Sequence, residues 1–248
     1  MSSVLHLWPG APSPGSPFAA DAALTSVSTF SVARVLVAEA VLRLKAGAET
    51  AQDRQLAVHG SHFLLLRPTL VSTAKAAWLL RPDDSRERVR RAVELVREDQ
   101  RQGASAMRKA VEVGAPNLFE SVAVMFDRTG TELRTTAGKV MGAVSEKPPR
   151  DEKLIRELGG DINKYYGTGH ATADLQLLWN VSSSLSHGER WHSLLTGPGR
   201  GAEVARTLTT RSLDVVCSAI NVTGLRIASL AATPPERNRQ SSSPLTTH

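Results

Sequence analysis

The chain has 248 residues, of which 41% are hydrophobic, 22% are charged and 4% are aromatic. This length predicts one large domain or two small ones, and a chain of this size buries a sizeable core without disulfides or metals. The balance of apolar and charged residues excludes a wholly disordered, collagen-like or coiled-coil protein.

Basic residues outnumber acidic ones by 30 to 24, which gives a formal net charge of +6. A positive net charge favours contact with nucleic acid or other anions but does not indicate a fold. The segment richest in arginine, residues 81–101, also contains six acidic residues. Such a mixture is typical of a solvated helix face crossed by ion pairs, so we expect surface pairs here rather than a phosphate site.

The two ends of the chain differ in composition from its middle. Residues 1–18 and 233–248 are rich in proline and polar residues, and such segments bury too little apolar surface to become ordered. We therefore predict a disordered N-terminal segment, a helical domain over 19–232 and a disordered basic tail. The N-terminal segment has no basic stretch and does not resemble a secretory signal, and no uncharged apolar run reaches the roughly 18 residues of a membrane span.

Cysteine usage agrees with a cytoplasmic location. Cys217 is the only cysteine, so an intramolecular disulfide and a structural zinc site built on thiolates are both excluded. A reducing compartment is the natural setting for such a chain. The sequence therefore predicts a cytoplasmic protein that does not contact a membrane.

The first half of the chain has a helical pattern. Strong helix formers fill residues 19–46, and an apolar stretch follows from about 55 to 80. The segment 81–85 ends that stretch, and Asp84 or Ser85 can cap the next helix. Apolar stripes at helical spacing then continue to Gly114, and from Leu118 to about 144, so both helices are expected to face a core.

The second half continues in the same way. A short helix near 151–158 precedes the glycine-rich segment 159–169, and another helix covers about 172–187. The last helix, about 202–231, carries two apolar stripes and is expected to be buried on two sides. No alternating run indicates a strand. We predict an all-α fold, a single bundle of six or seven helices that are mostly antiparallel.

A polar row lies near the end of the 172–187 helix. Gln176, Asn180, Ser183 and His187 are four, three and four residues apart, so they share one helix face. The row either faces solvent or lines a groove in which the His187 imidazole acts as acid or base. In the second interpretation three residues are catalytic: His187, Asn180 and Ser183. Four residues would then bind substrate: Arg67, Gln176, Arg190 and Trp191.

Arg67 is unusual because it stands inside an apolar run and is followed by Pro68. A buried arginine without a partner is costly, so Arg67 should meet a carboxylate, carbonyl groups or solvent. Glu39 and Asp174 are the natural carboxylate partners. Arg67 then either joins two helices through an ion pair or binds an anion.

Three other chemistries find little support in the sequence. Of the four histidines that might hold a metal, two are three residues apart and can share a helix face, but the other two are five apart and cannot, and the Glu-x-x-His motif of di-metal bundles is missing. The glycine-rich loop 196–201 fits neither phosphate-binding fingerprint. The serines beside His187 lack the strand–turn–helix elbow of a nucleophile. We expect no metal and no cofactor; the histidines concerned are His59, His62, His187 and His192.

Two segments carry a family resemblance. Residues 64–95 (LLLRPTLVSTAKAAWLLRPDDSRERVRRAVEL) and 182–197 (SSSLSHGERWHSLLTG) resemble a group of bacterial helical proteins that is similar to the HEPN superfamily. Active HEPN members are metal-independent, dimeric endoribonucleases whose signature is an arginine four to six residues before a histidine. His187 would be the signature histidine, but Asn180 stands seven positions before it and the arginine is absent.

The resemblance implies a HEPN-like homodimer that binds RNA or a nucleotide and is a degenerate or inactive endoribonuclease. An alternative is an enzyme or sensor that binds a small molecule in a polar groove around Arg67, Asn180 and His187. A third possibility is a purely structural role in binding a partner. Steep salt dependence of RNA binding would favour the first, and a deep apolar pocket joining Arg67 to His187 would favour the second.

Overall fold

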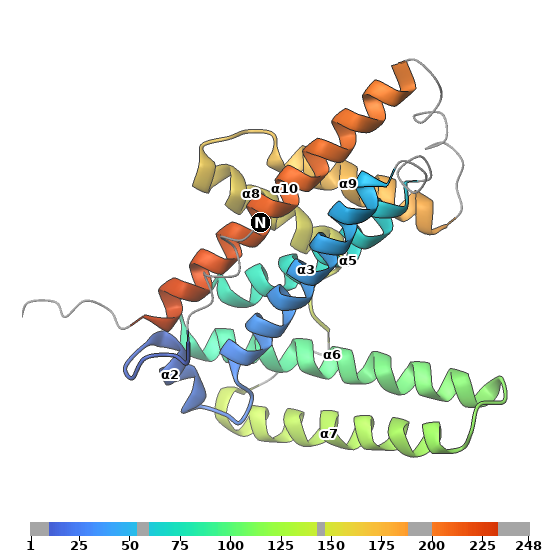
Figure 1. Cartoon of the computed structure of the whole chain (residues 1–248). Coiled ribbons are helices and arrows are strands. Elements are labelled where there is room, and N and C mark those ends of the chain that lie inside the picture. The colour runs from blue at the N-terminus through green and yellow to red at the C-terminus, as the bar shows by residue number, and fades with distance from the viewer. Residues whose placement is uncertain (1–9, 54–59, 143–146, 188–199, 233–248) are drawn as a thin grey trace, which may run out of the picture.

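The computed structural model describes residues 10–53, 60–142, 147–187 and 200–232. Within these ranges every regular element is a helix, which confirms the all-α prediction (Figure 1). Eight helices are present in the described part, rather than the six or seven predicted. They are α2 (Pro17–Ala22), α3 (Thr29–Gln52), α5 (Ser61–Leu80), α6 (Ser85–Glu112), α7 (Leu118–Met141), α8 (Asp151–Tyr166), α9 (Ala171–Ser186) and α10 (Arg200–Ala231).

The extra helix comes from two serine caps, of which Ser16 lies just before the first predicted helix and Ser28 lies inside it. The Ser16 hydroxyl accepts a hydrogen bond from the Ala19 amide at 3.3 Å, and the Ser28 hydroxyl accepts one from the Ser31 amide at 3.1 Å. A serine in this position satisfies an amide that would otherwise lack a partner at a helix start. The segment predicted as one helix over 19–46 is therefore split into α2 and α3.

The ordered part of the chain begins before residue 19, contrary to the predicted boundary. The Ser13 amide donates to the carbonyl of Ala231, at the end of α10, at 3.0 Å. Phe18 is buried and its ring centroid lies 5.2 Å from that of Phe30. Tertiary partners thus order residues 10–18, whose composition alone predicts disorder. Residues 1–9 and 233–248 lie outside the described part of the chain.

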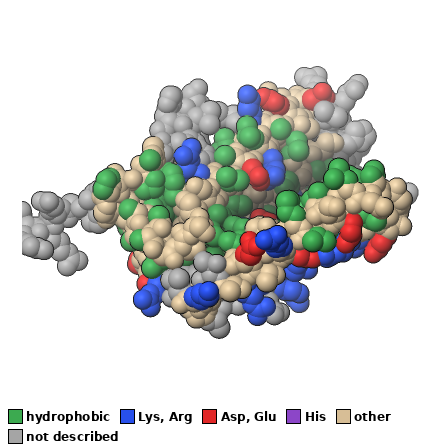
Figure 2. All heavy atoms as spheres, turned by 90° about the horizontal axis from the view of Figure 1, so that it is seen from below, with side chains coloured by type: hydrophobic (Ala, Val, Ile, Leu, Met, Phe, Trp, Pro, Cys, Tyr) green, Lys and Arg blue, Asp and Glu red, His purple; other side chains and the backbone are tan. Residues whose placement is uncertain are grey.

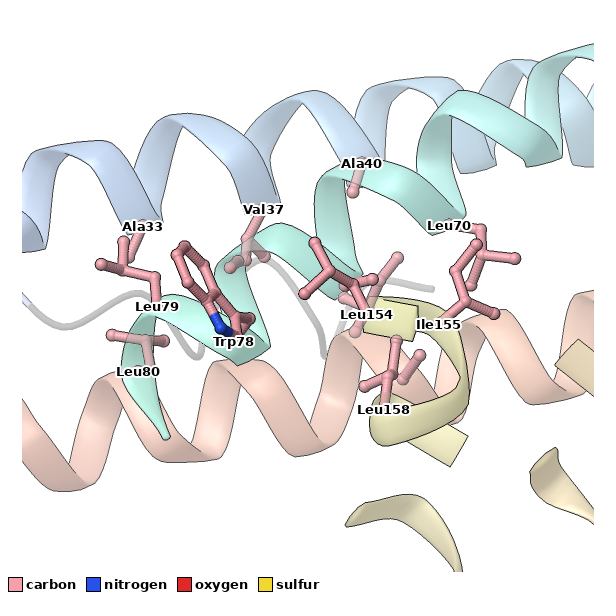
Figure 3. Close-up of a cluster of buried hydrophobic side chains, with 14 of the residues drawn as sticks. Ala33, Val37, Ala40, Leu70, Trp78, Leu79, Leu80, Leu154, Ile155 and Leu158 are labelled. Atoms are coloured by element: carbon pink, nitrogen blue, oxygen red, sulfur yellow. The ribbon is translucent and has the colours of Figure 1, made fainter. Parts of the chain in front are cut away.

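Helix α5 lies at the centre of the bundle. It packs most extensively on α3 and also contacts α6, α8, α9 and α10, and twelve of its twenty residues are buried. Figure 3 shows part of the core that it forms with α3 and α8. The labelled side chains are Ala33, Val37, Ala40, Leu70, Trp78, Leu79, Leu80, Leu154, Ile155 and Leu158.

Helices α6 and α7 form an arm that extends away from this core (Figure 1). The N-terminal half of α6 carries nearly all its buried residues, while α7 packs mainly on α6. Leu118 and Met125, which were expected to face a core, are 70% and 54% exposed. Seen from below, the molecule shows hydrophobic and charged side chains together on its surface, including this arm (Figure 2). The apolar pattern of α7 correctly predicts a helix but overstates its burial.

One arginine of the segment 81–101 is fully buried, which the prediction of a solvated face did not anticipate. The Arg88 guanidinium donates to both carboxylate oxygens of Asp21, at 2.7 and 3.0 Å, and neither side chain is more than 1% exposed. It also donates to the Pro82 and Asp83 carbonyls. Arg88 is buried because its side chain lies against α2, next to the apolar face of α6. Other arginines of this segment form the expected partly exposed pairs with Glu87, Glu94 and Glu98.

Two helices are long and apolar enough to span a membrane by length and composition alone. They are Ser61–Leu80, within α5, and Glu203–Ala231, within α10, and 61% and 39% of their most apolar windows are buried. A buried core helix meets the same criteria, so this is a weak indication of a membrane protein. Neither segment is an uncharged run of that length, because Ser61–Leu80 contains Arg67 and Lys75 and Glu203–Ala231 contains several charged residues.

Candidate anion-binding groove

Arg67 projects from α5 toward α9. Its guanidinium stacks over the ring of Trp179 at 4.5 Å from the centroid and donates to the hydroxyl of Ser186 at 2.8 Å. The predicted partners were wrong, because Glu39 pairs with Arg43 within α3 and Asp174 pairs with Arg211 of α10. Arg67 is half-buried at the edge of a groove, so its charge is met by an aromatic ring, a hydroxyl and solvent rather than by a carboxylate.

The groove beside Arg67 has a volume of about 540 Å³ and has three walls built from four segments of the chain. One wall comes from α5 and α9, a second from the middle of α6, and a third from the segment 147–152 that leads into α8. Five of the lining side chains are basic and three are acidic. They are Arg67, Lys75, Arg101, Lys147 and Arg150, with Glu98, Asp151 and Glu152; Gln102, Pro148, Pro149 and Trp179 complete the lining.

Some of these charges are neutralised locally. Arg101 forms an ion pair with Glu98 at 2.6 Å, and this hydrogen bond lowers the pKa of the Glu98 carboxyl. Lys75 lies 3.9 Å from the carboxylate of Asp99. Among the described residues, Arg67 and Arg150 form no ion pair. These two guanidinium groups are therefore unpaired cations of the lining, beside one lining carboxylate, that of Asp151, which also forms no ion pair in the described ranges.

A guanidinium that lies over an indole ring is a suitable contact for a nucleotide. Arginine presents its N–H groups in a planar fork that matches two phosphate oxygens. Its flat face and nearby aromatic rings also stack on nucleobases. The ring of Trp179 positions Arg67 without using up its donors, and only one of them is bonded to Ser186. The arrangement can bind an anion, with arginine supplying the charge and direction.

The predicted polar row lies on another side of α9. Asn180 and His187 are exposed, and Gln176 and Ser183 are half-buried. None of the four lines the Arg67 groove, and the helix buries the opposite face, which includes Leu178. His187 is the C-cap residue of α9, one position after the Ser186 that contacts Arg67. The row shares one face as the spacing predicts, while its catalytic role stays a prediction.

Other predicted site residues have mixed positions. Arg190 and Trp191 lie outside the described residues, as do His59, His192 and most of the loop 196–201. His62 is 2% exposed; its Nε2 lies 2.9 Å from the Thr209 hydroxyl, whereas its Nδ1 has no partner within the described ranges. Burial lowers the pKa of His62 to about 4, so this ring is a neutral core residue at neutral pH.

Sequence reasoning found Arg67 but missed the rest of the groove. Trp179, Lys75, Arg101 and Arg150 carry no local motif. These residues come from α5, α6, α9 and the approach to α8. No spacing along the chain marks them as neighbours, because tertiary packing brings them together.

No family model, curated protein or solved structure matches the chain. The HEPN resemblance therefore rests on the short motifs in 64–95 and 182–197.

Proposed function

We propose that the protein is a HEPN-like bundle of mostly antiparallel helices that binds RNA, with one nucleotide unit seated in the Arg67 groove. We further propose that it acts in the cytoplasm as a homodimer and does not cleave the RNA. The observation that carries the proposal is the Arg67 guanidinium, stacked on Trp179 at 4.5 Å and free of any carboxylate among the described residues.

The groove suits a nucleotide in size and charge. A volume of about 540 Å³ lies inside the range of about 300–1,000 Å³ that is usual for small-molecule sites. Its basic side chains attract phosphate, and its acidic ones, Glu98, Asp151 and Glu152, oppose long anionic contacts. A single nucleotide within a flexible strand meets this mixed lining better than the continuous backbone of a duplex.

The placement of the signature positions supports the proposed loss of cleavage. A ribonuclease of this kind needs a cation beside the scissile phosphate and a histidine close enough to transfer a proton. Asn180 carries no charge, and His187 does not line the groove that contains Arg67. The small-molecule alternative needs Arg67, Asn180 and His187 in one pocket, and among the described residues the Arg67 groove is lined by neither Asn180 nor His187.

The test measures the affinity of the full chain for a short fluorescein-labelled oligouridylate by fluorescence anisotropy. We expect Arg67→Gln to weaken binding about tenfold, which corresponds to about 1.4 kcal/mol. It should also reduce the slope of log affinity against log salt by about 0.7, the value for one lost contact with a single strand. Arg67→Lys keeps the charge but loses the planar guanidinium, so its affinity should lie between those of the unsubstituted chain and Arg67→Gln.

The matched control is Arg128→Gln, which removes a 79% exposed arginine from α7, outside the groove. It should leave the affinity nearly unchanged. Equal effects of the two glutamine variants would overturn the proposal. Competition with uridine monophosphate tests whether the groove holds a single nucleotide. Displacement of the labelled RNA by uridine monophosphate supports a nucleotide-sized site, and failure to displace it shows that the groove does not hold a nucleotide.

A further inference from the structure

A second cavity lies between α8, α9 and α10 and shares no lining residue with the Arg67 groove. Its volume is about 510 Å³. It is lined by the end of α8, the turn that follows, the start of α9 and the middle of α10. The lining residues that carry the argument are Arg211 and Asp214 of α10, Asp174 of α9, and an apolar floor of Ile162, Ala171 and Val215.

A buried carboxylate holds the cation of this cavity in place. Asp174 is 9% exposed, and its Oδ1 accepts a hydrogen bond from Arg211 at 2.5 Å. The Arg211 side chain is 53% exposed, and its guanidinium has no other hydrogen-bond partner among the described residues. Asp174 therefore fixes the direction of Arg211 while most of its donors remain open toward the cavity. Such a group binds a carboxylate in a fork geometry.

The same helix face also presents an unpaired anion. Asp214 is exposed and lies three residues after Arg211, which places the two β-carbons about 5–6 Å apart. Arg211 pairs with Asp174 instead, so Asp214 forms no ion pair with any residue in the described ranges. Burial, together with the negative charge of Asp214, raises the pKa of the nearby Cys217 thiol. The cavity thus has one fixed cation and one free anion at its rim.

The rest of the lining favours a small amphipathic ligand. Ile162, Ala171 and Val215 are all buried and supply an apolar floor. The Tyr166 hydroxyl, at the rim, accepts a hydrogen bond from the side-chain amide of Asn221 at 2.8 Å. A ligand seated here places its apolar part on the floor and its charged groups at Arg211 and Asp214.

We infer that this cavity binds a small zwitterion, a free amino acid with an apolar side chain, whose carboxylate meets Arg211 and whose ammonium meets Asp214. The inference goes beyond the proposed RNA binding and concerns a separate site. A ligand with only one charge leaves either Arg211 or Asp214 without its partner, which costs affinity.

The test uses isothermal titration calorimetry on the full chain with three matched probes. L-leucine carries both charges, 4-methylpentanoate lacks the ammonium and 3-methylbutylamine lacks the carboxylate. We expect leucine to bind at least about tenfold more tightly than either analogue, a difference of about 1.4 kcal/mol. Comparable affinities for the three probes, or no binding of leucine, would overturn the inference.

Substitutions then assign each charge. Asp214→Asn should remove the preference for leucine over 4-methylpentanoate. Arg211→Gln should remove the preference for leucine over 3-methylbutylamine. The controls are Glu203→Gln and Arg206→Gln, which change exposed residues of α10 outside the cavity and should leave all affinities unchanged.

Because Arg211→Gln also leaves buried Asp174 unpaired, the exposed Asp214→Asn decides the outcome: if it behaves like Glu203→Gln, the inference fails. RNA affinity should be the same in all four variants, so this result and that of the Arg67 test are independent.

Discussion

Helix α6 carries two arginine-centred regions that look alike in sequence and differ in structure. Near its start, Arg88 is fully buried with Asp21 and bonded to carbonyls around it. Near its end, in the arm, Arg108 is 42% exposed and pairs with Asp127 and Glu120 of α7. A buried charge depends on its partner for all its solvation, whereas an exposed charge has water as an alternative. Burial, and not the presence of an ion pair, therefore determines how much the pairing of an arginine contributes to the stability of this protein.

The largest expected effect comes from breaking the buried pair. Asp21→Ala removes the carboxylate that accepts two hydrogen bonds from Arg88 and leaves a buried charge uncompensated. We expect the free energy of unfolding to fall by about 3–5 kcal/mol, measured by urea denaturation followed by circular dichroism. Asp127→Ala is the matched control in the arm and should leave the unfolding midpoint unchanged within error. Equal losses in the two variants would contradict the comparison.

The pH dependence of stability extends the comparison to histidine. Burial lowers the pKa of His62 from an ordinary 6.5 to about 4, so the unfolded chain binds a proton more readily than the folded one. The stability due to neutral His62 is complete above about pH 6.5 and is lost as the pH falls through the folded value near 4. We expect the free energy of unfolding to drop by about 2–3 kcal/mol over this range.

Urea denaturation at several pH values checks this expectation. His62→Phe should show a smaller fall than the unsubstituted chain, since it lacks the buried titrating group. His170→Gln, at a histidine whose side chain is 65% exposed, should keep the original fall. A pH profile that does not change in His62→Phe would show that the ring is not responsible.

A smaller effect separates two neighbouring glycines of α8. A β-carbon on Gly159 would lie 2.6 Å from the Cα of Thr172 in α9, whereas one on Gly160 would meet nothing within 4 Å. We expect Gly159→Ala to reduce the free energy of unfolding by about 1–3 kcal/mol through overpacking. Gly160→Ala should be neutral or stabilising by up to about 1 kcal/mol, because alanine favours a helix. Thermal denaturation of the two variants gives the difference, and matching melting temperatures would argue against a close α8–α9 contact.

The glycine pair also explains one error of sequence reasoning. Residues 159–169 have the composition of a loop, yet α8 runs through both glycines to Tyr166. The helix tolerates Gly159 because the α9 backbone approaches so closely there that a larger residue would clash. Glycine is typical both of a loop and of a close helix crossing, so the sequence alone cannot distinguish the two. Only the position of the neighbouring helix does.

Other local features were predicted well because their causes are local. Residues 81–84 separate α5 from α6, and the Asp84 carboxylate accepts a hydrogen bond from the Glu87 amide at 3.0 Å, as a cap should. Arg88 has only a weak local signal of burial, since it lies four residues before buried Ala92 and seven before buried Leu95. Its acidic partner, Asp21, is 67 positions away, and nothing in the intervening sequence connects them.

The sequence by itself determined the helical class, most helix boundaries and the unusual status of Arg67. These follow from backbone propensity, caps and apolar spacing, which depend on residues within one or two turns. Tertiary structure alone decided that Arg88 is buried, that Arg67 meets Trp179 instead of Glu39, and that Arg211 is held by Asp174. Burial and charge pairing depend on which helices lie against each other, and that arrangement comes from packing across the whole chain.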